Sequence, residues 1–333
     1  DNKMASTSIT TAFVKQYGAT LDLLTQTMGG KFKGTHLEES IEGEEKYYDQ
    51  LGSVIAAEVS SRYANSPEND ISHDRRRVTA TAYDVGLMLD KFDKVQMLVN
   101  PESEYVQQQV TALMRKYDIE FLKGLFGTAQ TGKTGSGTAS LAAANKIAHN
   151  NSGLTIDKVA QAREIMETSG VDLSDPLNKP YLAVSPASLQ DLLTNTSVSS
   201  SDFNTIKTLV SGDMNTFYGF EIIKSNQLPF INDANDADGT NHIANLSWGA
   251  SDDLPVAASG GSTTAGKRAC VAYTRSAVRQ VANPTIQTEI SKRDDKSFNY
   301  YAYSCMRTGA VRMEEKKVVQ IGVKESGADA AGV

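Results

Sequence analysis

The chain has 333 residues, of which 40% are apolar, and a formal net charge of −7 at pH 7. This length allows a hydrophobic core and about two compact units, and the composition excludes a disordered chain. The acidic balance argues against a uniformly basic nucleic-acid-binding surface, although Arg75, Arg76 and Arg77 form a local basic run.

The two cysteines, Cys270 and Cys305, are too few for a disulfide framework and are typical of a reducing compartment. A single disulfide bond between these two cysteines is the alternative. The sequence has no run of about 18 apolar residues that would span a bilayer, and its first residues lack a secretion signal. We therefore expect a soluble intracellular protein with no membrane partner.

The first predicted element is a helix over residues 11–28, which ends at Gly29 and Gly30. Residues 31–45 then favour an extended conformation. Such an arm buries little against itself, so it needs another surface, either its own body or a neighbour. The apolar stripe of the helix consists of Phe13, Tyr17, Leu21, Leu24 and Met28.

Two strand-like runs, residues 46–60 and 75–90, flank the polar segment ANSPENDISHD. They predict a long hairpin whose legs reach up to ~50 Å at ~3.3 Å per residue. An isolated two-stranded ribbon is at best marginally stable in water. We therefore expect the hairpin to lie on another surface, such as that of a second subunit.

Pro101 begins the clearest predicted helix, which runs to Phe126. Glu102 and Glu104 lie at the end where the helix dipole is positive. A helix of this length is a rod of roughly 37 Å. Its apolar stripe consists of Val106, Val110, Leu113, Tyr117, Phe121 and Leu125.

The second half of the sequence alternates short strands and helices. We predict helices over residues 156–168 and 186–193, and strands over residues 181–184, 220–223 and 269–274. The chain then returns in further strands and ends in a polar tail. It shows no internal repeat of fixed period, which argues against a solenoid.

The segment GTAQTGKT, residues 127–134, matches the P-loop pattern letter for letter. A P-loop joins a buried strand to a helix, so that backbone N–H groups and the helix dipole bind phosphate. Here a long helix precedes the segment, and the following GSGTAS cannot start a helix. We predict a flexible linker; a P-loop nucleotide-binding protein is the less favoured alternative.

Other residues that could carry chemistry also have simpler interpretations. Ser185 lacks the glycines of a nucleophile elbow and is interpreted as a helix N-cap. Residues 233–238 match a calcium loop only loosely and predict a surface loop, with weak divalent binding as a minor alternative. We therefore predict no catalytic, cofactor or metal site and no enzyme. Four histidines are scattered without a second ligand at zinc-site spacing: His36, His73, His149 and His242.

The basic run of residues 75–77 is interpreted as a charged strand edge that blocks wrong pairing or meets acids on a partner. The acidic segment of residues 38–45 is the predicted counterpart. We therefore predict intersubunit contacts in these segments and in the hairpin turn. The candidates are Glu42, Glu44, Glu45, Pro67, Glu68, Asp70, Arg75, Arg76 and Arg77.

The order of arm, hairpin, long helix, mixed domain and returning strands resembles the major capsid protein of tailed bacteriophages. The resemblance covers about residues 8–323, and it implies an α+β fold of the Hong Kong 97 type. That fold has an N-arm, an E-loop hairpin, a spine helix, a peripheral (P) domain and an axial (A) domain. Four phrases carry the resemblance: PYLAVSPASLQDLL, YGFEIIKSNQLP, RACVAYTRSAVRQV and YAYSCMRTGAVRMEEKKVVQIGV.

The resemblance also implies a division of the chain into five segments. They are the N-terminal arm (1–40), the E-loop and its base (41–98), the spine helix with the first part of the P-domain (99–155), the A-domain (156–275), and the P-domain return strands with the C-terminal tail (276–333). Some family members form a lysine–asparagine cross-link. Lys46, Lys91 and Lys94 do not match that motif, so we predict no cross-link.

The implied function is a shell protein that self-assembles into the icosahedral head of a tailed bacteriophage around double-stranded DNA. The implied partners are identical subunits, as hexamers and pentamers, together with portal, scaffolding and decoration proteins and non-specifically held DNA. The implied location is the virion, assembled in the host cytoplasm. The alternative is an encapsulin-like nanocompartment shell, which shares the fold.

Overall fold

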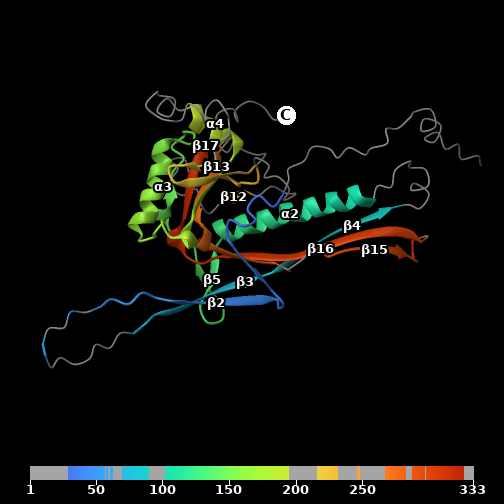
Figure 1. Cartoon of the computed structure of the whole chain (residues 1–333), viewed down its shortest axis with the longest axis horizontal. Coiled ribbons are helices and arrows are strands. Elements are labelled where there is room, and N and C mark those ends of the chain that lie inside the picture. The colour runs from blue at the N-terminus through green and yellow to red at the C-terminus, as the bar shows by residue number, and fades with distance from the viewer. Residues whose placement is uncertain are drawn as a thin grey trace, which may run out of the picture.

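A computed structural model describes residues 29–56, 58, 61–62, 70–89, 102–194, 216–231, 246–247, 267–282, 287–296 and 298–325. The subunit is elongated: a helix and long strands form a body, a lobe of mixed structure lies at one end, and a ribbon projects beyond it (Figure 1). The helix predicted over residues 11–28 lies outside the described residues.

The long helix α2 (Glu102–Phe126) confirms the prediction for this segment. Leu113, Tyr117, Phe121 and Leu125 of the predicted stripe are buried. Lys123 lies in the last turn, where the helix dipole favours a positive charge. The stripe therefore faces the rest of the body along most of the helix.

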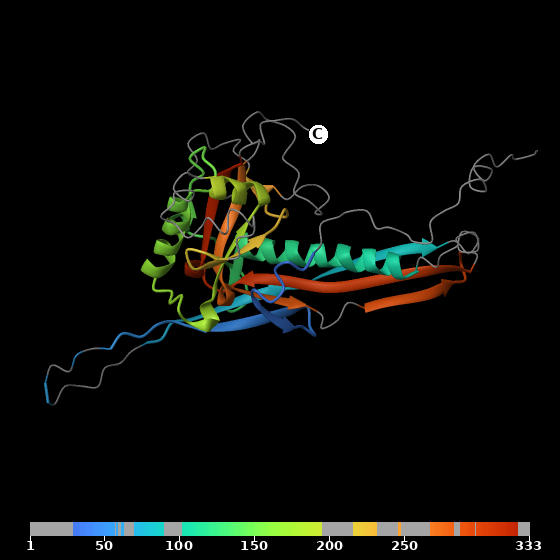
Figure 2. The same cartoon turned by 45° about the horizontal axis from the view of Figure 1, so that its top comes forward.

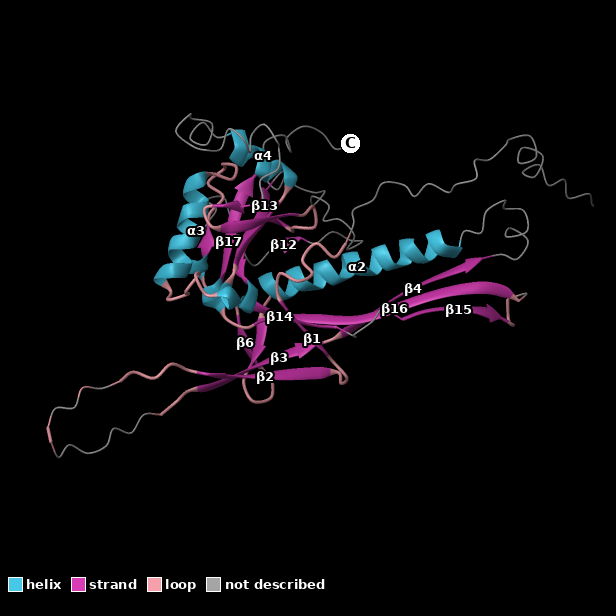
Figure 3. Ribbon diagram, viewed as in Figure 1, coloured by secondary structure: helices cyan, strands magenta, loops and turns pink. Residues whose placement is uncertain are grey.

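The helix α2 covers one face of a five-stranded sheet (Figure 3). β16 is the central strand: it pairs with β14 and β15 on one edge and with β4 on the other, and β1 pairs in parallel with β14. Met306 of β16 packs against Leu113 and Tyr117 of α2. The strands are β1 (Leu37–Ser40), β4 (Thr81–Leu89), β14 (Val278–Ala282), β15 (Gln287–Arg293) and β16 (Asn299–Arg312).

An eight-stranded sheet forms the lobe and contains the largest hydrophobic cluster. It confirms the predicted strands of the second half, and the helices α3 (Ile156–Thr168) and α4 (Pro186–Thr194) match their predicted ranges within one residue. Ser185 accepts a hydrogen bond from the Ser188 N–H at 3.1 Å, which confirms the N-cap. The strands are β7 (Lys146–Ile147), β8 (Pro180–Val184), β9 (Thr216–Phe217), β10 (Phe220–Lys224), β11 (Phe230–Ile231), β12 (Leu246–Ser247), β13 (Lys267–Thr274) and β17 (Val318–Lys324).

The strand β17 differs from expectation because it does not stay with the returning strands of the body. It pairs with β13 over seven residues and with β7 in parallel, and so lies inside the lobe. Val318 to Val323 are buried one after another, which is typical of a strand covered on both faces. A central sheet position therefore suits this strand better than a half-exposed one.

The predicted hairpin is wrong in its length and pairing. Among its described residues, the first leg forms a strand over β2 (Glu45–Leu51), and the second leg divides into β3 (His73–Thr79), which pairs with β2, and β4, which pairs with β16. The break is at Ala80, a buried residue whose N–H donates to the Glu44 carbonyl and whose carbonyl accepts from the Arg307 guanidinium. The chain therefore passes from one sheet into another at this residue.

The glycine-rich segment after α2 is a hairpin, so the prediction of a flexible linker is wrong. Strands β5 (Ala129–Thr131) and β6 (Gly137–Ala139) extend the sheet of β2 and β3. Gly132 and Gly135 take φ values of 84° and 70°, the left-handed region that glycine enters without strain. With a strand inside the motif and another strand after it, the strand–loop–helix context of a P-loop is absent from this described segment.

Short 3-10 turns complete the described secondary structure. They are η1 (Ala143–Asn145), η2 (Pro176–Asn178), η3 (Arg275–Ala277) and η4 (Glu315–Lys317). η4 joins β16 to β17 and so links the body sheet to the lobe sheet. A carboxylate of this turn, that of Glu315, faces two arginine side chains that enter from the body.

Arg312 at the end of β16 joins the end of α2 to the β5–β6 hairpin. Its side chain is fully buried, and it donates to the carbonyls of Leu125 and Gly127 at 2.8 and 2.7 Å and to that of Ala139 at 3.0 Å. The last carbonyls of a helix have no partner within the helix. Arg312 therefore caps α2 and fixes the hairpin with one guanidinium group.

We predict that Arg312→Met destabilises the unassembled subunit by about 3–5 kcal/mol, because three buried carbonyls and Glu315 lose a charged partner. Urea denaturation measures the effect. The half-exposed Arg163 of α3 provides a matched control, since Arg163→Met should cost less than about 1 kcal/mol. An equally small effect of Arg312→Met would contradict the capping role.

Candidate intersubunit surfaces

The described residues of the distal hairpin, 51–56 and 70–72, project away from the body and are called the ribbon here (Figure 2). Next to the last paired residues of the ladder, Leu51 and His73, the Gly52 N–H donates to the Ser72 carbonyl at 2.8 Å. The described ribbon exposes aliphatic side chains in place of burying them. Their exposed fractions are 71% for Leu51, 49% for Val54, 84% for Ile55 and 39% for Ile71.

The base of the ribbon has one inner and one outer face, since side chains alternate along a strand. The inner residues Tyr48 and Val78 are buried in a small hydrophobic cluster. That cluster also contains Ile41, Ala80, Ala129, Val281, Val311 and Met313. The base is therefore part of the body, whereas none of the described residues of the ribbon belongs to a hydrophobic cluster.

The basic run divides between these two faces. Arg76 is 5% exposed and pairs with Glu315 at 3.1 Å, so it anchors the base within its own chain. Arg75 pairs with Asp49 on the outer face, and the hydrogen bond from Arg75 holds the pKa of that carboxyl below its usual value. Sequence reasoning treated the three arginines as one surface group and missed the buried position of the middle one.

Part of the acidic segment of residues 38–45 pairs with the basic run inside the same chain. Arg77 forms an ion pair with Glu45 at 3.0 Å. Glu42, Glu44 and Asp70 are exposed, and none of them forms an ion pair within the described residues. Pro67 and Glu68 lie outside the described residues. A contact of these residues with a second subunit remains a prediction.

The end of the N-arm crosses α2 and is fastened to it. The backbone N–H groups of Lys31 and Phe32 donate to the Asp118 carboxylate at 3.0 and 3.4 Å. His36 stacks on Phe121, with ring centroids 4.5 Å apart. The arm is thus fixed at the middle of the long helix before it leaves the described region.

A salt-bridge cluster joins the same arm to the ribbon base. The Glu39 carboxylate of β1 pairs with Lys46 of β2 and with Arg279 of β14, and it accepts a hydrogen bond from Tyr48 at 3.2 Å. The Arg279 guanidinium lies 4.8 Å from the centre of the Tyr48 ring. Arm, ribbon and body sheet are therefore connected through one carboxylate.

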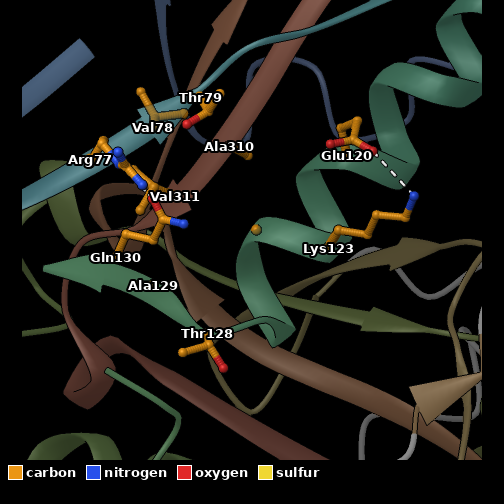
Figure 4. A pocket seen from close by; sticks show the side chains of 11 residues that line it. Arg77, Val78, Thr79, Glu120, Lys123, Thr128, Ala129, Gln130, Ala310 and Val311 are labelled. Carbon is orange, nitrogen blue, oxygen red and sulfur yellow. Dashed lines mark hydrogen bonds and ion pairs between the residues drawn. The ribbon is translucent and has the colours of Figure 1, made fainter. Parts of the chain in front are cut away.

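A cavity of about 210 Å³ lies where the ribbon base meets the end of α2. Its charged side chains are already paired. Lys123 pairs with Glu120 at 3.3 Å (Figure 4). Arg77 donates to Gln130 and to Glu45. We therefore assign no ligand to it. It is lined by Arg77, Val78, Thr79, Glu120, Lys123, Gly124, Thr128, Ala129, Gln130, Ala310 and Val311.

The metal-ligating side chains of the described residues lie apart from one another. Among them, no three His, Cys, Asp or Glu side chains gather in a way that would hold a metal ion. Cys270 is buried and Cys305 partly exposed, and both are free thiols. None of the helices in this part of the chain has the length and hydropathy needed to cross a membrane.

We predict that His36 makes the stability of the subunit fall in acid. Burial lowers the pKa of His36 to about 4, whereas an unfolded histidine has a pKa near 6.5. The unfolded chain therefore binds a proton first as the pH falls from 6.5 towards 4, and stability is lost across that range. Between pH 7 and pH 5, wild type should lose about 2 kcal/mol more than His36→Phe in urea denaturation.

The Asp118 carboxyl titrates in the same pH range but changes the stability of the subunit in the opposite direction, because burial raises its pKa to about 6. Its folded form binds a proton first, so it adds stability as the pH falls below 6. This contribution is present in both proteins and cancels in the comparison. Equal losses for wild type and His36→Phe would show that the imidazole is not the cause.

Comparisons with known proteins agree with this architecture. Residues 9–325 match the family model described as phage capsid protein. The solved capsid of Cyanophage P-SCSP1u aligns at a TM-score of 0.65 and 17% identity, covering 94% of each chain. That of Cyanophage Pam1 aligns at 0.66 and 13% identity, covering 94% of this chain and 96% of the other.

The capsid of Helicobacter pylori bacteriophage KHP30 aligns at a TM-score of 0.65 and 10% identity, covering 97% of this chain and 99% of the other. No curated protein matches the chain in sequence. The structural likeness confirms the predicted α+β fold of the Hong Kong 97 type, and the family match extends over nearly the whole chain. The chain therefore belongs to the phage capsid protein family, as a major capsid protein.

Proposed function

We propose that identical copies of this chain associate as hexamers and pentamers and close into the icosahedral head shell of a tailed bacteriophage. The observation that carries the proposal is the ribbon, whose exposed aliphatic side chains have no partner within the described part of their own chain. Exposed apolar groups that gather on a projecting element are typical of an interaction site. In a capsid protein, the expected partner is another subunit.

The physical basis of assembly is the burial of this apolar surface against neighbours. Each Å² of apolar surface removed from water contributes about 25 cal/mol, so a few aliphatic side chains per contact give a modest favourable term. A closed symmetric shell repeats such contacts around every subunit without leaving a growing edge. Many weak contacts can thus add up to a stable particle.

The proposal places the protein in the virion, after assembly in the host cytoplasm. Portal, scaffolding and decoration proteins are the candidate further partners of such a head. The shell would enclose double-stranded DNA and hold it without sequence preference. The net charge of −7 supports weak contact with DNA, since like charges repel across the inner wall.

Electron microscopy of the expressed protein tests the shell directly, and Ile55→Asp tests the ribbon. Ile55 is 84% exposed, so this change should alter the unfolding free energy of the subunit by no more than about 0.5 kcal/mol. A carboxylate at this position must be dehydrated in a subunit contact, which is costly. We expect wild type to form uniform closed particles and Ile55→Asp to remain unassembled.

Asn151→Asp is the matched control, since it adds the same charge at an exposed loop of the lobe. This variant should assemble as wild type does. Particles formed equally well by Ile55→Asp would remove the ribbon from the assembly contacts. Particles filled with a protein cargo and not with nucleic acid would point instead to an encapsulin-like compartment.

DNA binding provides a separate test of the proposed inner wall. Purified empty shells, opened so that their interior is accessible, should bind short duplex DNA weakly at physiological salt, because a negative wall offers few phosphate partners. Fluorescence anisotropy of labelled duplex measures the affinity. Tight binding that weakens steeply with added salt would indicate a basic inner surface and contradict the expectation.

A further inference from the structure

Lys158 is a buried lysine in the first turn of α3, the helix that lies beside β17 in the lobe (Figure 1). The residue is 6% exposed. A positive charge is disfavoured in the first turn of a helix, because this end of the helix dipole is itself positive. Burial of an unpaired ammonium group is also costly. The position of Lys158 therefore requires strong compensation from the groups around it.

Four backbone carbonyls supply this compensation, and we call their oxygens the carbonyl cage. The Lys158 ammonium donates to the carbonyls of His149 and Ser152 at 2.9 and 3.0 Å. It also donates to those of Gly153 and Gly322 at 3.0 and 3.1 Å. An ammonium group has three N–H donors, so four oxygens satisfy all of them. The positive charge is thus surrounded by the negative ends of peptide dipoles.

The loop before α3 is bent so that three of these carbonyls converge. Asn150 and Asn151 are both left-handed, with φ values of 47° and 50°. The conformation is uncommon for residues with a Cβ, although asparagine adopts it more readily than most. The Ser152 N–H donates to the His149 carbonyl at 3.0 Å and closes the turn. Backbone strain of this kind is typical of segments that clamp a ligand.

The fourth carbonyl belongs to β17, which is distant in the sequence. The ladder between β7 and β17 covers two residue pairs. Beyond it, the Lys324 N–H donates to the Ser152 carbonyl at 2.9 Å. The hydrogen bond from Lys158 to the Gly322 carbonyl joins residues 164 positions apart. The loop and its lysine therefore continue the contacts that β7 begins along β17.

Lys158 keeps its charge at neutral pH. Burial lowers the pKa of Lys158 to about 8, so the amine is mostly protonated at pH 7. Cys270 and Asp191 act on it in the opposite direction and raise that pKa. Burial raises the pKa of the Cys270 thiol to about 11, so this thiol is neutral. The carbonyl dipoles and the Asp191 carboxylate therefore balance the charge in the cage.

We propose that the carbonyl cage is a binding site for a primary ammonium ion, which Lys158 fills from within its own chain. Carbonyl oxygens that surround a point replace the hydration shell of a monovalent cation. A compact ammonium on a flexible stem suits such a site, whereas the planar guanidinium of arginine does not. By filling the cage, Lys158 fastens β17 to the loop before α3.

The proposal defines a ligand that can be supplied from outside. Lys158→Ala removes the side chain beyond Cβ, a fragment with the size and charge of propylammonium. The emptied site should therefore bind propylammonium. It should discriminate against molecules that lack the charge or the N–H donors, because charge-assisted hydrogen bonds hold the ion in the cage.

Urea denaturation of the unassembled subunit tests this binding. Propylammonium chloride should raise the midpoint of Lys158→Ala in a saturable manner, since a ligand of the folded state alone stabilises that state. It should leave wild type unchanged. Propanol has a similar shape without the charge, tetramethylammonium has the charge without an N–H donor, and neither should stabilise the variant. Equal effects of propylammonium and propanol, or of propylammonium on variant and wild type, would overturn the proposal.

A refolding experiment covers the case in which Lys158→Ala does not fold by itself. The same three compounds are added during refolding, and circular dichroism measures the recovery of folded protein. Recovery with propylammonium alone supports the site. Recovery with none of the compounds, or with all three, contradicts it.

Lys158→Met separates the charge from the packing of the stem. It keeps an unbranched apolar side chain but leaves the four carbonyls without a charged donor, so the equilibrium constant for unfolding should rise about 100-fold or more. Lys179→Met is the matched control, since the Lys179 side chain is 53% exposed and pairs with Glu221. Its constant should rise less than about fivefold. Similar effects of the two changes would remove the cage as a stabilising contact.

Amide hydrogen exchange shows whether Lys158 fastens β17 to the loop. In Lys158→Met, the Lys324 amide at the loop–strand contact should exchange at least about tenfold faster than in wild type, because the contact opens locally. The Ser225 amide donates to the Val184 carbonyl elsewhere in the lobe at 2.9 Å and should change much less. Equal increases at both amides would mean that the whole lobe loosens and that Lys158 does not fasten this strand in particular.

Discussion

The contact between α2 and β16 is the interaction on which the rest of the subunit depends. At the lobe end, helix and strand approach so closely that a Cβ on Gly124 would lie 2.6 Å from that of Ala310. Further along, polar groups replace apolar packing: Gln109 donates to the Ala302 carbonyl and accepts from Ser304, both within hydrogen-bonding distance. One helix on one sheet thus makes a long body, and at the lobe end the sheet also packs against the ribbon base through Val281 and Val311.

Elements that reach beyond this body are fastened at their bases by buried charge. Arg76, Arg312 and Glu315 hold the ribbon base and the end of α2 together, and Asp118 holds the arm. A buried ion pair adds little net stability but is costly to break when one partner is lost. Such contacts therefore fix the position of the ribbon and the arm, while the aliphatic side chains of the ribbon stay exposed.

The chain also connects the two ends of the subunit mechanically. Ala80 alone separates β3 from β4, so one short stretch of backbone runs from the ribbon base into the distal sheet. A Cβ on Gly309 would lie 2.2 Å from the Thr79 carbonyl, which shows how tightly β16 crosses that stretch. The ribbon base and the distal sheet are therefore joined without an intervening loop.

The sequence by itself determined the local elements and the family. Helical spacing in residues 102–126 and 156–168 and the apolar strand of residues 269–274 each correspond to elements of the structure, because these patterns depend on neighbours close in sequence. Strand partners did not follow from the sequence. The division of the hairpin at Ala80, the place of β17 in the lobe, the buried position of Arg76 and the carbonyl cage around Lys158 all depend on residues more distant in the chain. Only the tertiary structure brings those partners together, since strand propensity does not specify which strands pair.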